Sequence, residues 1–319
     1  MSWQRVLDPA LGDGWAAGAA RCFVVRTPAD AARLLRGLGG ARWTPVRGLP
    51  AGVDEGVFLD LAPLAGVRTV DAVDGAVHVE AGATWAGVEA RLGEQGLTLG
   101  PLMGLGDEMI AESLAAPWDR RPSPRFGWLR DGLLALRAAL PSGVTRCAVA
   151  PRRATGPDLA RVPVGAGQRA GLITDVHLRV WPVVETSGRA ASFRGWNEAR
   201  AAAMAAWAAG CRPVWWCLRR AGRKVALTAA VPAMELSRFD AATGALPAEV
   251  EAPGAALVPA RAVSGADLAA GLAGITRAEV WDLRPEGATV YAARGADLPV
   301  DDDWNALAER VFAALGGQR

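Results

Sequence analysis

The sequence is short of the side chains that enzymes most often use for proton transfer. Its 319 residues include two histidines (His78 and His177), one tyrosine (Tyr291) and one lysine (Lys224). Its net charge is only +2, and it has no run of five or six basic residues. This composition indicates neither a nucleic-acid-binding protein nor one that binds membrane surfaces. General acid-base catalysis therefore has few candidates, and the catalytic residues are unknown from sequence alone.

Several site-forming patterns are also missing. The cysteines Cys22, Cys147, Cys211 and Cys217 form no CxxC pair, and no histidine lies near enough in sequence to complete a zinc set. We therefore expect no metal and interpret the cysteines as free thiols in a reducing cytoplasm. We expect no signal peptide, because the N-terminus shows no charged segment followed by an apolar one, and no apolar run reaches the roughly 18 residues of a membrane helix. Walker and Rossmann fingerprints are absent as well.

The first half of the chain has mixed strand and helix patterns. Thr27 and Pro28 are typical of a helix start, and the helical spacing continues to Leu38. Asp74-Gly75 between two alternating segments predicts a hairpin. Thr84 is expected to cap a helix over 85–95. Further strands are predicted over 22–27, 42–48, 57–61, 133–140, 145–149 and 172–180.

A break over 182–188 is the predicted boundary between an N-terminal domain, residues 1–183, and a C-terminal domain, residues 184–319. The second domain is predicted to place helices over a small antiparallel sheet. Its patterns predict a helix over 196–209, strands over 214–219 and 224–229, a loop over 244–260 and a final helix over 303–315. Trp196, Trp207 and Trp215 are interpreted as core or partner-interface residues, with ligand binding as the alternative.

Four segments occur in an order that resembles the FAD-linked oxidases, the vanillyl-alcohol oxidase/p-cresol methylhydroxylase (PCMH) family. The segments are VFLDLAPLAGV, VHVEAGATWAGVEARLGEQGLTLG, RFGWLRDGLLALRAALPSG and ATGPDLARVPVGAGQRAGLITDVHLRVWP. Within the family, the chain most resembles the glycolate oxidase FAD-binding subunit, the D-lactate dehydrogenases and alkyldihydroxyacetonephosphate synthase. The resemblance implies an α+β fold, with a two-subdomain PCMH-type FAD-binding domain followed by a shortened ferredoxin-like cap domain.

The resemblance also implies FAD as the cofactor, held by main-chain N–H groups of glycine-rich loops. Carried over position by position, the residues implied to line the cofactor are Arg47, Gly48, Gly52, Gly106, Ile110, Ala111, Asp158, Gly165, Gly167, Gly171, Leu172 and Ile173.

Two of these loops depart from the family pattern. Leu49 and Pro50 replace glycines in the first loop, and Pro50 removes a backbone donor. Asp107 and Glu108 replace glycines in the second, where they would face a dianionic pyrophosphate. Like charges about 4 Å apart cost about 4 kcal/mol at a protein surface. Both departures weaken the expectation of FAD binding.

Two functions therefore remain open. The first is an FAD-binding oxidoreductase subunit that oxidises a small 2-hydroxy acid, beside a homologous flavoprotein subunit and an iron–sulphur subunit. The second is a non-catalytic partner or scaffold of a flavoprotein complex that has lost FAD binding. The motif order favours the first, and the altered loops favour the second.

Overall fold

The computed structural model describes residues 20–48, 56–100, 106–115, 123–146, 163–167, 171–250, 257–264, 279–280 and 287–293. The N-terminal half begins with a three-stranded parallel sheet in the order β1-β3-β2. Its strands are β1 (Ala20–Val24), β2 (Thr44–Val46) and β3 (Gly56–Asp60), and helix α1 (Pro28–Leu38) connects the first two.

Helix α1 begins and ends where its sequence predicts. Thr27 Oγ1 accepts a hydrogen bond from the backbone N–H of Asp30 at 3.1 Å, and Pro28 occupies the first turn. Gly39 ends the helix in a left-handed conformation with φ of 57°. Leu34 and Leu35 lie on its buried face, so the helix packs against the core of the N-terminal half.

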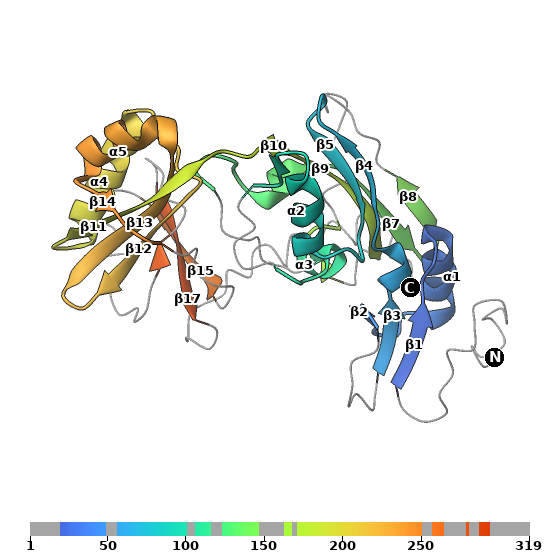
Figure 1. Cartoon of the computed structure of the whole chain (residues 1–319). Helices are drawn as coiled ribbons and strands as arrows, with labels where there is room; N and C mark the ends of the chain where they lie inside the picture. Colours follow the sequence, from blue (N-terminus) through green and yellow to red (C-terminus); the bar gives the residue numbers. More distant parts are fainter. Residues whose placement is uncertain are drawn as a thin grey trace.

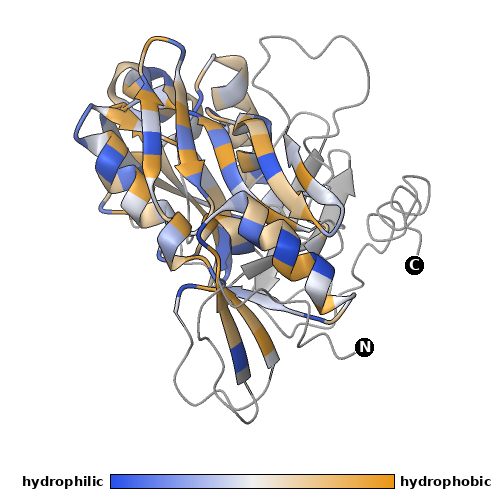
Figure 2. Cartoon of the chain, turned by 90° about the vertical axis from the view of Figure 1, so that its right-hand side faces the viewer, coloured by the Kyte–Doolittle hydropathy of each residue, from blue (hydrophilic) through white to orange (hydrophobic). Residues whose placement is uncertain are grey.

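A five-stranded antiparallel sheet in the order β4-β5-β9-β7-β8 forms the second layer. The predicted hairpin around Asp74-Gly75 is confirmed as its β4-β5 pair. Hydrophilic and hydrophobic residues alternate along strands of this half (Figure 2), as expected when only one face of a sheet packs against the core. The strands are β4 (Val67–Asp71), β5 (Ala76–Glu80), β7 (Leu133–Leu140), β8 (Gly143–Arg146) and β9 (Leu172–Arg179).

Short helices complete the N-terminal half. Thr84 caps α2 through a hydrogen bond from the N–H of Gly87, as the sequence predicts. A two-stranded pair, β10-β6, lies where the chain leaves this half. The elements are η3 (Ala62–Leu64), α2 (Trp85–Gly93), β6 (Leu97–Thr98), α3 (Ile110–Ala115), η4 (Leu129–Gly132) and β10 (Trp181–Pro182).

The C-terminal half has its own core under helices α4 and α5 (Figure 1). Its seven-stranded sheet has the order β14-β11-β13-β12-β16-β17-β15, and each pairing is antiparallel. The elements are β11 (Thr186–Phe193), α4 (Trp196–Ala208), β12 (Trp215–Ala221), β13 (Lys224–Pro232), η7 (Ala233–Glu235), α5 (Leu236–Thr243), β14 (Leu246–Pro247), β15 (Leu257–Ser264), β16 (Glu279–Val280) and β17 (Gly287–Ala293).

One sequence prediction for this half needs correction, because β14 and part of β15 lie in the predicted 244–260 loop. Strand β11 begins at Thr186, inside the 182–188 segment of the predicted boundary. Trp215 is buried, as expected of a core residue, but in a separate cluster with Cys217 and Ala230. Trp216 joins Trp196 in the core beneath the helices, because neighbouring strand residues face opposite sides of a sheet. The predicted helix over 303–315 lies outside the described residues.

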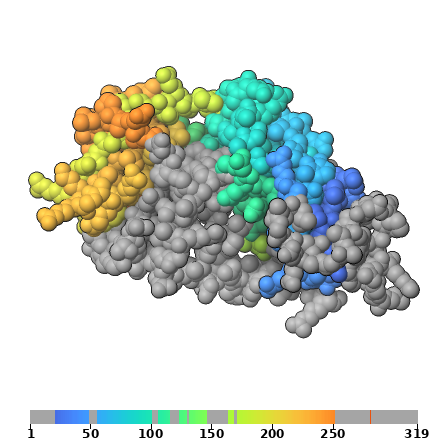
Figure 3. Space-filling model, turned by 60° about the horizontal axis from the view of Figure 1, so that its bottom comes forward, coloured from blue at the N-terminus to red at the C-terminus, as the bar shows by residue number. Residues whose placement is uncertain are grey.

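The two halves lie at opposite ends of the molecule (Figure 3). Residues 123–127 of the N-terminal half form hydrogen bonds with the C-terminal half. Ser123 Oγ donates to the backbone oxygen of Val214 in the C-terminal half at 2.6 Å. Arg125 Nη1 donates to Glu235 Oε1, also in the C-terminal half, at 2.9 Å. The joint therefore includes a largely buried ion pair. Within the described residues, no helix is both long and apolar enough to cross a membrane.

Candidate functional site

The predicted cofactor-binding residues lie in three segments of the N-terminal half. In the first, Gly48 adopts a φ of 78° and donates its N–H to Asp60 Oδ1 at 2.9 Å. The same oxygen accepts the N–H of Ala62, so one carboxylate organises the chain after β2 and after β3. Arg47 is exposed. Gly52, Leu49 and Pro50 lie outside the described residues.

The second segment packs along the start of α2. The carbonyls of Gly106 and Glu108 accept hydrogen bonds from the first N–H groups of that helix. Ile110 and Ala111 donate their N–H groups to the carbonyls of Ala83 and Ala81, at 3.0 and 2.8 Å. These two N–H groups are therefore engaged with the protein, and both side chains belong to the core.

The two acidic residues of this segment differ in environment. Asp107 is exposed, whereas Glu108 is half-buried. Glu108 Oε2 accepts a hydrogen bond from Ser113 Oγ at 3.0 Å, and Ser113 Oγ accepts one from Trp85 Nε1 at 2.9 Å. The Glu108 carboxylate is thus turned toward a buried hydroxyl.

The third segment leads into strand β9. Gly165 donates its N–H to the carbonyl of Leu114 at 2.7 Å, which connects this segment to α3. Gly171 has a φ of +84°, and a Cβ atom there would lie 2.2 Å from the carbonyl oxygen of Ala139. Leu172 and Ile173 are 2% exposed and belong to the core. Asp158 lies outside the described residues.

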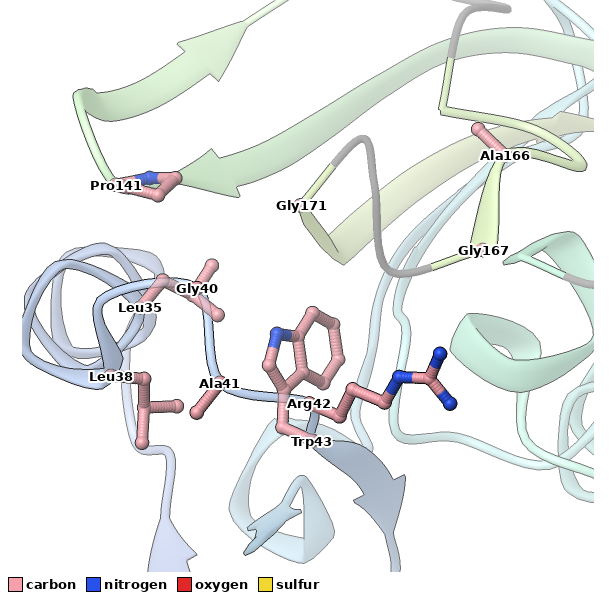
Figure 4. A pocket seen from close by; sticks show the side chains of 10 residues that line it. All are labelled: Leu35, Leu38, Gly40, Ala41, Arg42, Trp43, Pro141, Ala166, Gly167 and Gly171. Atoms are coloured by element: carbon pink, nitrogen blue, oxygen red, sulfur yellow. The ribbon is translucent and has the colours of Figure 1, made fainter. Parts of the chain in front are cut away.

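A pocket of about 560 Å³ lies between the third segment and the chain from the end of α1 to Trp43 (Figure 4). The turn between β7 and β8 contributes Pro141 to its wall. Sequence reasoning identified only two of the lining residues, Gly167 and Gly171. It missed Arg42 and Trp43, although they precede the Arg47-Gly48 loop by only a few residues. The pocket is lined by Leu35, Leu38, Gly40, Ala41, Arg42, Trp43, Pro141, Ala166, Gly167 and Gly171.

The residues that line the pocket suit the binding of a small ligand with aromatic and anionic parts. Among the described residues that line it, Arg42 is the only charged one, and Trp43 supplies an aromatic surface. The volume lies within the range of small-molecule and cofactor sites. The ADP portion of FAD carries a flat aromatic ring beside an anionic group. Such a ring can stack on an indole, and such an anion can pair with a guanidinium and approach glycine backbone closely. The described residues of this side therefore fit the cofactor that the motifs imply.

The two histidines lie elsewhere, on the face of the five-stranded sheet opposite the core residues Val77 and Val176. Their imidazole rings stack with centroids 4.1 Å apart, and His78 Nε2 lies 2.9 Å from Asp175 Oδ1. Both are half-buried, as is usual for polar positions of alternating strands. They do not line the pocket.

Thiols and metals add little to the candidate chemistry. Burial raises the pKa of the Cys22 and Cys211 thiols, and the nearby Asp60 and Glu235 carboxylates respectively raise it further. These cysteines are therefore poor sources of thiolate. Within the described part of the chain, no three His, Cys, Asp or Glu side chains are grouped so as to hold a metal.

Comparison with known proteins agrees with this geometry. Residues 39–148 match the FAD binding domain family. D-lactate dehydrogenase [cytochrome], mitochondrial, from Arabidopsis thaliana is 30% identical over 151 residues, which are 47% of this chain and 26% of that protein. The match thus spans about a quarter of the relative's length.

Solved structures extend the likeness in fold to nearly the whole chain. One structure of alkyldihydroxyacetonephosphate synthase has a TM-score of 0.67 at 13% identity, covering 93% of this chain and 71% of that one. A second has a TM-score of 0.64 at 13% identity, covering 92% and 74%. The predicted α+β fold class is confirmed, and FAD is the cofactor that this domain family supports. The FAD-linked oxidase family is thus supported for residues 39–148, the part of the chain that the FAD binding domain family matches.

Proposed function

We propose that this chain binds FAD and acts as the FAD-binding subunit of an oxidoreductase that oxidises a small 2-hydroxy acid. The main support is the pocket of about 560 Å³, because it joins two of the predicted cofactor-binding glycines, Gly167 and Gly171, to Trp43 and Arg42. Residues of α1 and of segments next to strands of both N-terminal sheets thus converge on one ligand-sized space.

In this proposal the pocket receives the adenosine portion of FAD, with the Trp43 indole in its wall and Arg42 near the phosphates. Gly48 and Gly106 are the described residues next in sequence to the two predicted pyrophosphate loops. Gly165 donates to the carbonyl of Leu114 in α3 and directly precedes the lining residues Ala166 and Gly167. Ile110, Ala111, Leu172 and Ile173 support the site from the core.

The substrate class is supported by the similarity to a D-lactate dehydrogenase and by the motif order. Bound FAD would supply the two-electron oxidation, while the protein supplies binding and orientation. A homologous flavoprotein subunit and an iron–sulphur subunit are the proposed partners. A reducing, cytoplasmic location is part of the proposal, and Cys22, Cys211 and Cys217 are free thiols in the structure.

Visible absorbance of the purified protein tests the proposal. We expect flavin absorbance, with FAD released on denaturation, and bleaching under anaerobic conditions when glycolate or D-lactate is added. Trp43→Leu should weaken FAD binding by about 3- to 10-fold, the value of an aromatic pair. Arg33→Gln, a change on the exposed side of α1, should leave binding unchanged. A colourless protein that takes up no added FAD would refute FAD binding and favour the non-catalytic scaffold.

A further inference from the structure

The hydrogen-bonded chain Trp85–Ser113–Glu108 has a defined direction. An indole N–H can only donate, so Trp85 Nε1 must use a lone pair of the Ser113 hydroxyl. The single proton of that hydroxyl then remains for Glu108 Oε2, 3.0 Å away, and an ionised carboxylate can only accept. Trp85 is 0% exposed and Ser113 is 5% exposed, so the first two members are anchored in the core.

Glu108 therefore accepts the hydrogen bond that a buried Trp85–Ser113 relay donates, whereas its neighbour Asp107 is exposed. Both residues lie beside Gly106, in the segment that the proposed function places near the FAD pyrophosphate. Coulomb repulsion falls with distance, and it is halved when the separation doubles. A carboxylate held toward the interior thus repels a dianion less than one that rotates freely above the loop.

This inference rests on the proposed function. We propose that Trp85 and Ser113 are positioning residues that hold the Glu108 carboxylate away from the cofactor pyrophosphate and thereby set the affinity for FAD. The relay compensates for a charge at a position where a glycine would carry none. Asp107 has no such restraint among the described contacts and supplies the remaining repulsion.

Ionic strength distinguishes this mechanism from a purely structural role. Salt screens exposed charges over about 10 Å at 0.1 M. Releasing Glu108 should therefore weaken FAD binding mainly at low ionic strength, and added salt should restore most of the loss. A general loosening of the fold would not recover in this way.

The experiment compares FAD dissociation constants, from quenching of flavin fluorescence, at low and high ionic strength. Ser113→Ala should weaken binding by about tenfold at low salt, equivalent to about 1.4 kcal/mol. The double variant with Glu108→Gln should return to wild-type affinity, because no charge remains to be positioned. Glu112→Gln removes a charge from an exposed position of α3, the helix that contains Ser113, and should leave the affinity for FAD unchanged.

Glu108→Asp provides a second test that leaves the core intact. Its shorter side chain withdraws the carboxylate from Ser113, so it should weaken binding in the same salt-dependent manner. The inference is overturned if Ser113→Ala and Glu108→Asp leave affinity unchanged, or if Ser113→Ala weakens binding equally with Glu108→Gln present. If the wild type binds no FAD at either ionic strength, the proposed function itself fails, and the inference fails with it.

Discussion

The ion pair between Arg125 and Glu235 offers a quantitative test of how the two halves are held together. Glu235 Oε1 accepts from Arg125 Nη1 at 2.9 Å, and Oε2 accepts from the backbone N–H of Arg212 at 2.6 Å. The side chains are 7% and 25% exposed respectively. We expect Arg125→Ala to leave a buried carboxylate with only one of these two partners.

The magnitude follows from this burial. Breaking a fully buried pair costs about 3–5 kcal/mol, because one charge remains without compensation. Since a quarter of Arg125 is exposed, water relieves part of the cost, and about 2–3 kcal/mol is expected for Arg125→Ala. Glu235→Ala should cost at least as much, because the N–H of Arg212 also loses its acceptor. The double variant should be less destabilised than the sum, with a coupling energy of about 1–3 kcal/mol.

Urea denaturation followed by tryptophan fluorescence measures these values, since Trp207 and Trp216 lie in the C-terminal half. The matched control is the exposed pair of Arg33 and Asp30 within α1, which is 53% and 13% exposed. Its coupling energy should be below about 1 kcal/mol. Additive effects of Arg125→Ala and Glu235→Ala would refute the conclusion that this pair holds the joint.

Three further changes probe the N-terminal half. Gly171→Ala should lower the free energy of unfolding by about 1–3 kcal/mol or more, because the new Cβ adds a clash with the Ala139 carbonyl to the strain of a positive φ. Denaturation measures this loss, and an unchanged stability would contradict the contact. Burial raises the pKa of Glu89 in the folded state. Glu89 therefore contributes fully to the free energy of unfolding below the normal glutamate pKa of about 4.3, and this contribution is lost as the pH rises through the raised pKa. Glu89→Gln should therefore stabilise the protein at neutral pH, with the gain vanishing in acid, and a pH-independent difference would refute the assignment. Thr27→Ala should cost about 1 kcal/mol through loss of the α1 cap, and Thr27→Ser should restore it.

Sequence reasoning was most successful where neighbouring residues determine the structure. The start of α1 at Thr27-Pro28, the hairpin at Asp74-Gly75 and the cap of α2 at Thr84 all depend on short-range hydrogen bonding or fixed dihedrals. The family resemblance also depends on linear order, and the comparisons confirm it. It was less successful in the C-terminal half, where β11 and β14 lack strong alternation and gain their strand structure from pairing with distant segments.

The amino-acid sequence by itself therefore determined the fold class and the family, together with the departures from glycine at residues 107 and 108. Only the tertiary structure decided that Trp216 faces the helices, that Arg42 and Trp43 share a pocket with Gly171, and that Glu108 is held by Ser113. The physical reason is separation along the chain. The pocket is lined by residues that lie more than a hundred positions apart in the sequence. Which of their side chains face the pocket depends on tertiary packing that no local pattern encodes.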